Sequence, residues 1–126
     1  MPVALVVDRD VLVRNVVRGA LVLHGFEAMD AADADEASLL CRSFSDEQLG
    51  LLIIEYCLAI ENSGALFKRL TQSCPTSKVI LTAAASYQQV LEMGGIPATA
   101  SFLQKPFTSD QLMAAVNDMM RPPSIH

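Results

Sequence analysis

Short apolar runs, each bounded by polar or turn-forming residues, divide this chain. They cover residues 3–7, 51–54, 78–81 and 100–103, and a weaker run covers residues 27–30. Short apolar runs with such boundaries are typical of β-strands, and continuous apolar character, as in 3–7 and 51–54, indicates strands covered on both faces. The run at 27–30 is assigned mainly from its place in the alternation. The pattern therefore constrains the chain to a sheet with buried central strands.

Helical periodicity fills the segments between the strand-like runs. The first helix is expected over residues 10–24, with Gly25 as its C-terminal cap. Five apolar side chains of this segment recur at helical spacing and are expected on one inward face: Val13, Val16, Val17, Ala20 and Leu21. A second helix is expected over residues 35–44.

Three further helix starts can be placed from local signals. Ser63 is expected to open a third helix that ends before Pro75. The inward side chains of this helix are expected to be Leu66, Phe67 and Leu70. Two pairs have the spacing of a capping box and predict the starts of a fourth and a fifth helix: Ser86 with Gln89, and Thr108 with Gln111.

Five strands that alternate with five helices predict an α/β fold with an open parallel sheet and helices on both faces. This is the flavodoxin-like, doubly wound (βα)5 plan, with five parallel strands in the order 2-1-3-4-5. A length of 126 residues, with 52% hydrophobic and 18% charged residues, fits one packed domain. Residues 1–121 are expected to form that domain, and residues 122–126 an irregular tail.

Charge and cysteine usage exclude several classes of function. The net charge of -5 and the lack of a basic patch argue against nucleic acid as a partner. Cys41, Cys57 and Cys74 have no paired short spacing, so neither a disulfide framework nor a zinc site is indicated. No apolar run approaches membrane-spanning length, and the N-terminus lacks a basic leader. We therefore expect a cytoplasmic protein that binds no membrane.

Polar and charged residues follow the predicted strands at their carboxyl ends, where ligands bind in such sheets. Asp8, Arg9, Glu55, Thr82 and Lys105 are expected to converge there. Carboxylates in such a cluster suit a hard cation such as Mg²⁺, Thr82 can donate a hydrogen bond, and Lys105 can neutralise an anion as a point charge. No organic cofactor is indicated.

In its ordered motifs the chain resembles the receiver domain of two-component response regulators, over essentially its whole length. The motifs are Leu-Val-Val-Asp at 5–8, Ile-Leu-Thr-Ala at 80–83 and Phe-Leu-Gln-Lys-Pro-Phe at 102–107. Residues 24–27 and 31–37 also resemble the second strand of the family and its flanks. The resemblance implies a signalling domain that receives a phosphoryl group from a histidine kinase.

The resemblance places Glu55 at the phosphoacceptor position, which is an aspartate in the family, with Thr82 and Lys105 as the other catalytic residues. It implies a Mg²⁺ site formed by Asp8, Glu55 and the backbone carbonyl of Cys57. The thiol of Cys57 is expected to be a small packing group. Arg9 stands where the family usually has a second acid, and its positive charge would repel that metal ion. The resemblance also assigns Phe102 as the switch aromatic, although a core aromatic is an equally good reading.

These departures predict that conventional phosphorylation is impaired or absent. Glutamate is one methylene longer than aspartate, and a misplacement of about 1 Å can slow a reaction roughly a hundredfold. Arg9 adds positive charge where a divalent cation would bind. Two readings of Glu55 stay open: a charge that partly replaces a phosphoryl group and pairs with Lys105 or Arg9, or a solvated carboxylate in a degenerate site.

The leading prediction is a stand-alone atypical receiver that binds a histidine kinase, a phosphotransfer protein or an output protein. The expected partner or homodimer face lies on the fourth helix, the fifth strand and the fifth helix. Its candidate residues are Tyr87, Leu91, Met93 and the segment 102–107, which includes Pro106.

Two alternatives remain. The first is a phosphorylatable receiver that uses Mg²⁺ and accepts a phosphoryl group from a histidine kinase on Glu55 or Asp10. Its self-dephosphorylation is the only catalytic activity we expect of this chain. The second is a small flavodoxin-like enzyme or nucleotide binder. The second is disfavoured because no glycine-rich loop follows residues 3–7.

Overall fold

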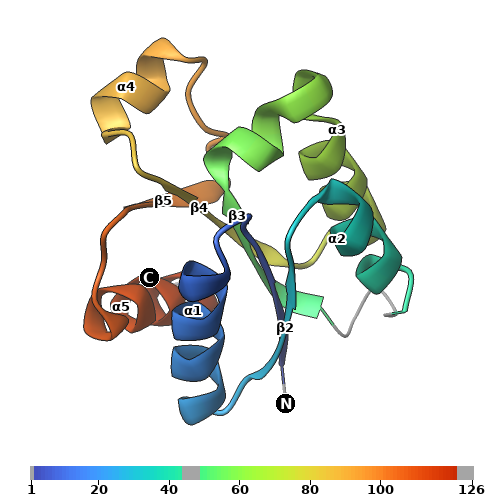
Figure 1. Cartoon of the computed structure of the whole chain (residues 1–126), viewed down its shortest axis with the longest axis vertical. Coiled ribbons are helices and arrows are strands. Elements are labelled where there is room, and N and C mark those ends of the chain that lie inside the picture. The colour runs from blue at the N-terminus through green and yellow to red at the C-terminus, as the bar shows by residue number, and fades with distance from the viewer. Residues whose placement is uncertain (1, 44–48, 122–126) are drawn as a thin grey trace, which may run out of the picture.

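The computed structural model describes residues 2–43 and 49–121. Strands and helices alternate throughout these residues (Figure 1). In chain order they are β1 (Val3–Val7), α1 (Val11–Leu23), β2 (Glu27–Ala31), α2 (Ala34–Cys41), β3 (Leu49–Glu55), α3 (Tyr56–Ser73), β4 (Lys78–Ala83), α4 (Tyr87–Glu92), β5 (Ala100–Gln104) and α5 (Ser109–Met120). Phe44, the expected end of the second helix, and the expected tail at 122–126 lie outside the described residues.

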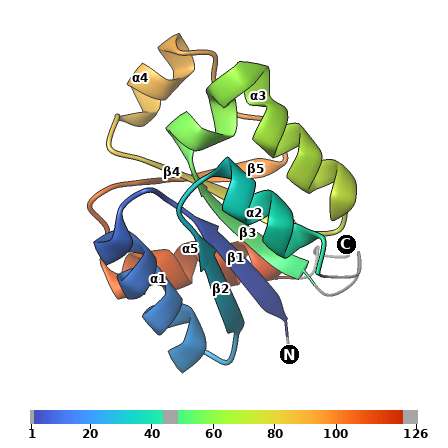
Figure 2. The ribbon, with the colours of Figure 1, turned by 45° about the vertical axis from the view of Figure 1, so that its right-hand side comes forward.

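The strands form one parallel sheet in the order β2-β1-β3-β4-β5. This confirms the predicted flavodoxin-like topology. Helices α1 and α5 lie on one face of the sheet, and α2 and α3 lie on the other (Figure 2). Because all strands run the same way, their carboxyl ends meet at a single edge of the sheet, as the sequence analysis required.

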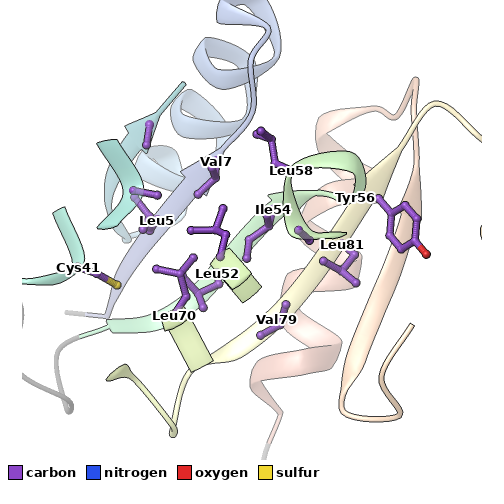
Figure 3. Close-up of a cluster of buried hydrophobic side chains, with 14 of the residues drawn as sticks. Leu5, Val7, Cys41, Leu52, Ile54, Tyr56, Leu58, Leu70, Val79 and Leu81 are labelled. Carbon is purple, nitrogen blue, oxygen red and sulfur yellow. The ribbon is translucent and has the colours of Figure 1, made fainter. Parts of the chain in front are cut away.

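Strand β1 shows how the continuous apolar runs become a core with two sides. All of its residues are buried. Leu5 and Val7 pack with Leu52 of β3 on the side of α2 and α3 (Figure 3). Ala4 and Val6 face the side of α1 and α5. Burial of a Val or Leu side chain stabilises a fold by about 1.5–3 kcal/mol, so the central strands dominate the stability of this sheet.

Some helix termini lie where local sequence signals placed them, and others have caps that were not predicted. The predicted capping boxes of α4 and α5 are both present. Asp10 caps the N-terminus of α1 by accepting a hydrogen bond from the Leu12 amide. Gly25 follows the C-cap residue of α1 at φ 90°, a conformation that glycine adopts without a Cβ clash.

Two expectations about the helices need correction. Helix α3 begins at Tyr56, directly after β3, and the expected start at Ser63 corresponds only to its second helical part, which begins after Gly64. Ser63 lies in an interruption of α3, where residues 62–64 have positive φ values of 52°, 58° and 77°. Val16 is 55% exposed although its spacing placed it on the inward face of α1. No helix among the described residues has the length and apolar character needed to cross a bilayer.

Candidate functional site

The candidate site lies at the carboxyl edge of the sheet, where strand register brings distant residues together. Glu55, the last residue of β3, is paired in register with Thr82 of β4. Thr82 is in turn paired with Leu103 of β5, two residues before Lys105. The Lys105 amide donates a hydrogen bond to the Ala83 carbonyl over 2.7 Å, which holds the chain beyond β5 against β4. The sheet thus aligns three of the predicted site residues.

Asp8 and Lys105 form the buried ion pair of the site. Lys105 Nζ lies 2.6 Å from Asp8 Oδ2, with only 5% of the Asp8 side chain and 19% of the Lys105 side chain exposed. The second carboxylate oxygen of Asp8, Oδ1, accepts a hydrogen bond from the Asp10 amide over 2.8 Å. Both oxygens of Asp8 are therefore engaged, as a buried charge requires.

Arg14 holds the loop that carries Asp8, and sequence reasoning missed it. Its Nη1 donates to the carbonyl oxygens of Asp8 and Arg9 over 2.7 and 3.2 Å. Its Nε donates to Asp30 Oδ2 over 2.9 Å, which ties α1 to β2. A signal was present in the sequence, since Arg14 interrupts an apolar helix one turn after Asp10 and Asp30 ends the neighbouring strand.

Glu55 joins β3 to α3. It is half-buried, and its Oε2 accepts a hydrogen bond from the Leu58 amide over 3.1 Å, so that Glu55 caps the N-terminus of α3. The expected pairing of Glu55 with Lys105 or Arg9 is not the arrangement found, because Lys105 binds Asp8 and Arg9 binds Glu61. Thr82 lies beside Glu55 and is only 2% exposed.

Arg9 extends over the surface of the site and pairs with Glu61, which lies at the interruption of α3. The hydrogen bond that Arg9 donates to Glu61 raises the pKa of the Arg9 guanidinium above its ordinary value, and the charge of Glu55 raises it further. The two side chains are 59% and 41% exposed, so the pair contributes little to stability. It does place a cation close to Glu55.

Cys57 lies in the first turn of α3, and its exposure corrects the expectation of a packing thiol. Desolvation raises the pKa of the Cys57 thiol above its ordinary value, and the neighbouring Glu55 carboxylate raises it further. The thiol is therefore mainly protonated at neutral pH, and its exposure leaves it accessible to reagents in solution.

The carboxylates of the expected Mg²⁺ site are engaged with other groups in this structure. Within residues 2–43 and 49–121, no three His, Cys, Asp or Glu side chains are grouped so that they could hold a metal ion. Asp8 is committed to Lys105 and to the Asp10 amide, and Glu55 to the Leu58 amide. A Mg²⁺ ion, which prefers near-octahedral oxygen ligation, would therefore have to compete with these hydrogen bonds for both carboxylates.

The predicted switch and interface residues lie on α4, on β5 and in the segment that follows β5. The rings of Tyr87 and Phe102 are 5.5 Å apart with an interplanar angle of 55°, which is a favourable tilted contact. Pro106 lines an open apolar groove of about 430 Å³ between α1 and the segment after β5. Val16 lines the same groove, which accounts for its exposure.

Comparisons with known proteins add to this geometry. No protein-family model matches the chain. The transcriptional regulatory protein CpxR of Klebsiella pneumoniae is 27% identical over 118 residues, which are 93% of this chain and 48% of that protein. This chain thus spans about half the length of that relative. The chemotaxis protein CheY of Bacillus subtilis is 25% identical over 90% of this chain and 92% of its own.

Among solved structures, a response regulator from Thermotoga maritima superimposes with a TM-score of 0.74. It is 24% identical, and the match covers 95% of this chain and 98% of that one. The structural likeness establishes the fold. The two sequence relatives, at 27% and 25% identity, support a response-regulator receiver domain over most of this chain.

Proposed function

We propose that this receiver acts by binding another signalling protein and that its conventional phosphorylation is impaired or absent. The observation that supports this proposal is the cation of Arg9, which follows Asp8 in the chain, pairs with Glu61 and lies close enough to Glu55 for that charge to raise its pKa. The site therefore carries two cations of its own, Arg9 and Lys105. We assign residues 1–121 to one receiver domain, because one sheet of five strands joins its elements.

Charge and geometry both oppose metal-assisted phosphoryl transfer at this site. Such transfer depends on a bound metal that neutralises the charge developing on the phosphoryl group. A divalent cation that approached Asp8 and Glu55 would be repelled by Arg9, and it would compete with Lys105 for Asp8. Glu55 has one carboxylate oxygen bound to the Leu58 amide, so it already serves as the cap of α3.

The side formed by α4 and β5 is the proposed contact face for a partner or for a second copy of the chain. Tyr87, Leu91 and Met93 are 48%, 45% and 51% exposed there. Large apolar side chains that lie together on a surface favour protein–protein contact. In this proposal the Glu55 side chain takes the place of a phosphoryl group, so the conformation of the contact face does not depend on phosphorylation.

The test is a Mg²⁺ titration followed by addition of acetyl phosphate, with intact mass as the readout. We expect the unmodified protein to show neither saturable Mg²⁺ binding nor the mass of an added phosphoryl group. The double variant Arg9→Asp with Glu55→Asp removes the opposing cation and shortens the acceptor, and we expect it to show both. Arg121→Asp is the matched control, because Arg121 also forms an exposed ion pair, with Asp118.

A phosphoryl mass shift in the unmodified protein would contradict the proposal and favour the phosphorylatable receiver. The role of Glu55 is tested separately with Glu55→Ala. We expect this variant to shift the amide resonances of α4, because it removes both a charge at the site and the cap of α3. Unchanged α4 resonances would show that Glu55 is a solvated carboxylate without influence on the contact face.

A further inference from the structure

Tyr56 is a buried polar residue that the proposed site does not use. It follows Glu55 directly and is 2% exposed. Its hydroxyl donates a hydrogen bond to the Gly95 carbonyl over 3.0 Å, between residues 39 positions apart in sequence. Figure 3 shows the Tyr56 ring at the edge of the buried cluster, with its hydroxyl directed away from the aliphatic side chains. A phenol in a core needs such a partner.

Gly95 links the Tyr56 hydroxyl to the C-terminal end of α4 by hydrogen bonds. Its amide donates to the Val90 carbonyl over 2.9 Å, while its own carbonyl accepts from Tyr56. Gly95 has φ 76°, a conformation that glycine adopts readily and that closes the C-terminal end of α4. A hydrogen-bonded connection therefore runs from Tyr56 through Gly95 to Val90.

Helix α4 depends on such outside contacts. It has only six residues, which is far too short for a helix to be stable by itself in water. Val90 is the one buried residue of α4, and the helix projects from the rest of the fold (Figure 1). The capping box at Ser86 and Gln89 stabilises the first turn locally but does not attach the helix to the sheet.

We propose that Tyr56 is the positioning residue that attaches α4 to the carboxyl end of β3. Glu55 and Tyr56 are adjacent, so a change in charge or backbone at position 55 reaches α4 through the Tyr56 hydroxyl. The two states are the bonded and the released Tyr56–Gly95 contact, and their populations set the position of α4. This inference rests on the proposed function only in treating α4 as part of the contact face.

The test is amide hydrogen exchange of the full chain with Tyr56→Phe, which keeps the ring and removes the hydroxyl. We expect amides of α4 and of residues 93–95 to exchange about three to ten times faster, because one hydrogen bond that resists local opening is lost. Amides of α5 are expected to keep their rates, which shows that the fold is intact. Thr71→Val is the matched control, because it also removes a hydroxyl that donates to a backbone carbonyl, that of Phe67 within α3, and should leave α4 exchange unchanged.

Equal exchange of α4 amides in Tyr56→Phe and in the unmodified protein would overturn the inference. The connection to position 55 is tested by Glu55→Ala in both backgrounds. We expect Tyr56→Phe to reduce the α4 resonance shifts caused by Glu55→Ala by at least about half, and equal shifts in both backgrounds would overturn the route through Tyr56. Neither measurement involves metal or phosphodonor, so a phosphorylated unmodified protein would contradict the proposed function alone.

Discussion

Replacing Lys105 by methionine isolates the energetic role of the buried ion pair. The substitution keeps most of the side-chain volume but leaves the Asp8 carboxylate, 5% exposed, without its cation. Loss of one partner from a fully buried pair costs about 3–5 kcal/mol. Here Lys105 is 19% exposed and Asp8 keeps its hydrogen bond from the Asp10 amide, so we expect a smaller loss of about 2–3 kcal/mol.

Urea unfolding measures this loss. With an m-value of roughly 1.5–2 kcal/mol/M, the midpoint of Lys105→Met should fall by about 1–2 M at an unchanged slope. Adding Asp8→Asn to the same chain should restore about 1–2 kcal/mol, because the cost arises from an unpaired charge and the amide carries none. Lys78→Met, at an exposed position, is the control and should stay within about 0.5 kcal/mol. A loss below about 0.5 kcal/mol in Lys105→Met would refute the reasoning.

Three further outcomes follow from burial. Leu52→Ala, at a fully buried position in the centre of the sheet, should lower the free energy of unfolding by about 2–5 kcal/mol in urea. Burial raises the pKa of the Cys41 thiol from 9.0 to about 12, so the native state holds this proton longer. The free energy of unfolding should therefore fall as the pH rises from 9.0 to about 12. In Cys41→Ala this fall should be shallower by up to about 1.4 kcal/mol per pH unit. Iodoacetamide should label Cys57 alone in the native state, with Cys41 and Cys74 labelled only after unfolding, as peptide masses would show.

The sheet was predictable because its strands are short apolar runs with polar ends. Residues 3–7 match β1 in full, and the other runs are shorter than their strands by one or two residues at one end, or at both ends for β3. The capping boxes at Ser86 and Thr108 were also predictable, since the signal lies within four residues. Val16 was misplaced because periodicity cannot reveal that a groove is left open beside α1.

The site was less predictable than the fold, because its contacts join residues far apart in sequence. The convergence of Asp8, Thr82 and Lys105 followed from the parallel order of the strands. The contacts of Tyr56 with Gly95 and of Arg9 with Glu61 did not, because each depends on where a loop or an interrupted helix places its residue. Glu55 was placed correctly at the strand end, but its bond to the Leu58 amide required the early start of α3.

The interruption of α3 begins at Glu61, the residue that pairs with Arg9 of the site. Asn62 and Ser63 adopt positive φ, which costs a residue with a Cβ about 1–2 kcal/mol relative to a regular helix. Such strain persists only where the surrounding structure determines it, and it clusters at functional sites. Here it lies directly after Glu61, the partner of Arg9. The exposed Arg9–Glu61 pair contributes too little to offset this strain, so the pair alone does not account for the interruption. The same interruption explains why Ser63 was read as a helix start, because the second helical part of α3 begins just after it.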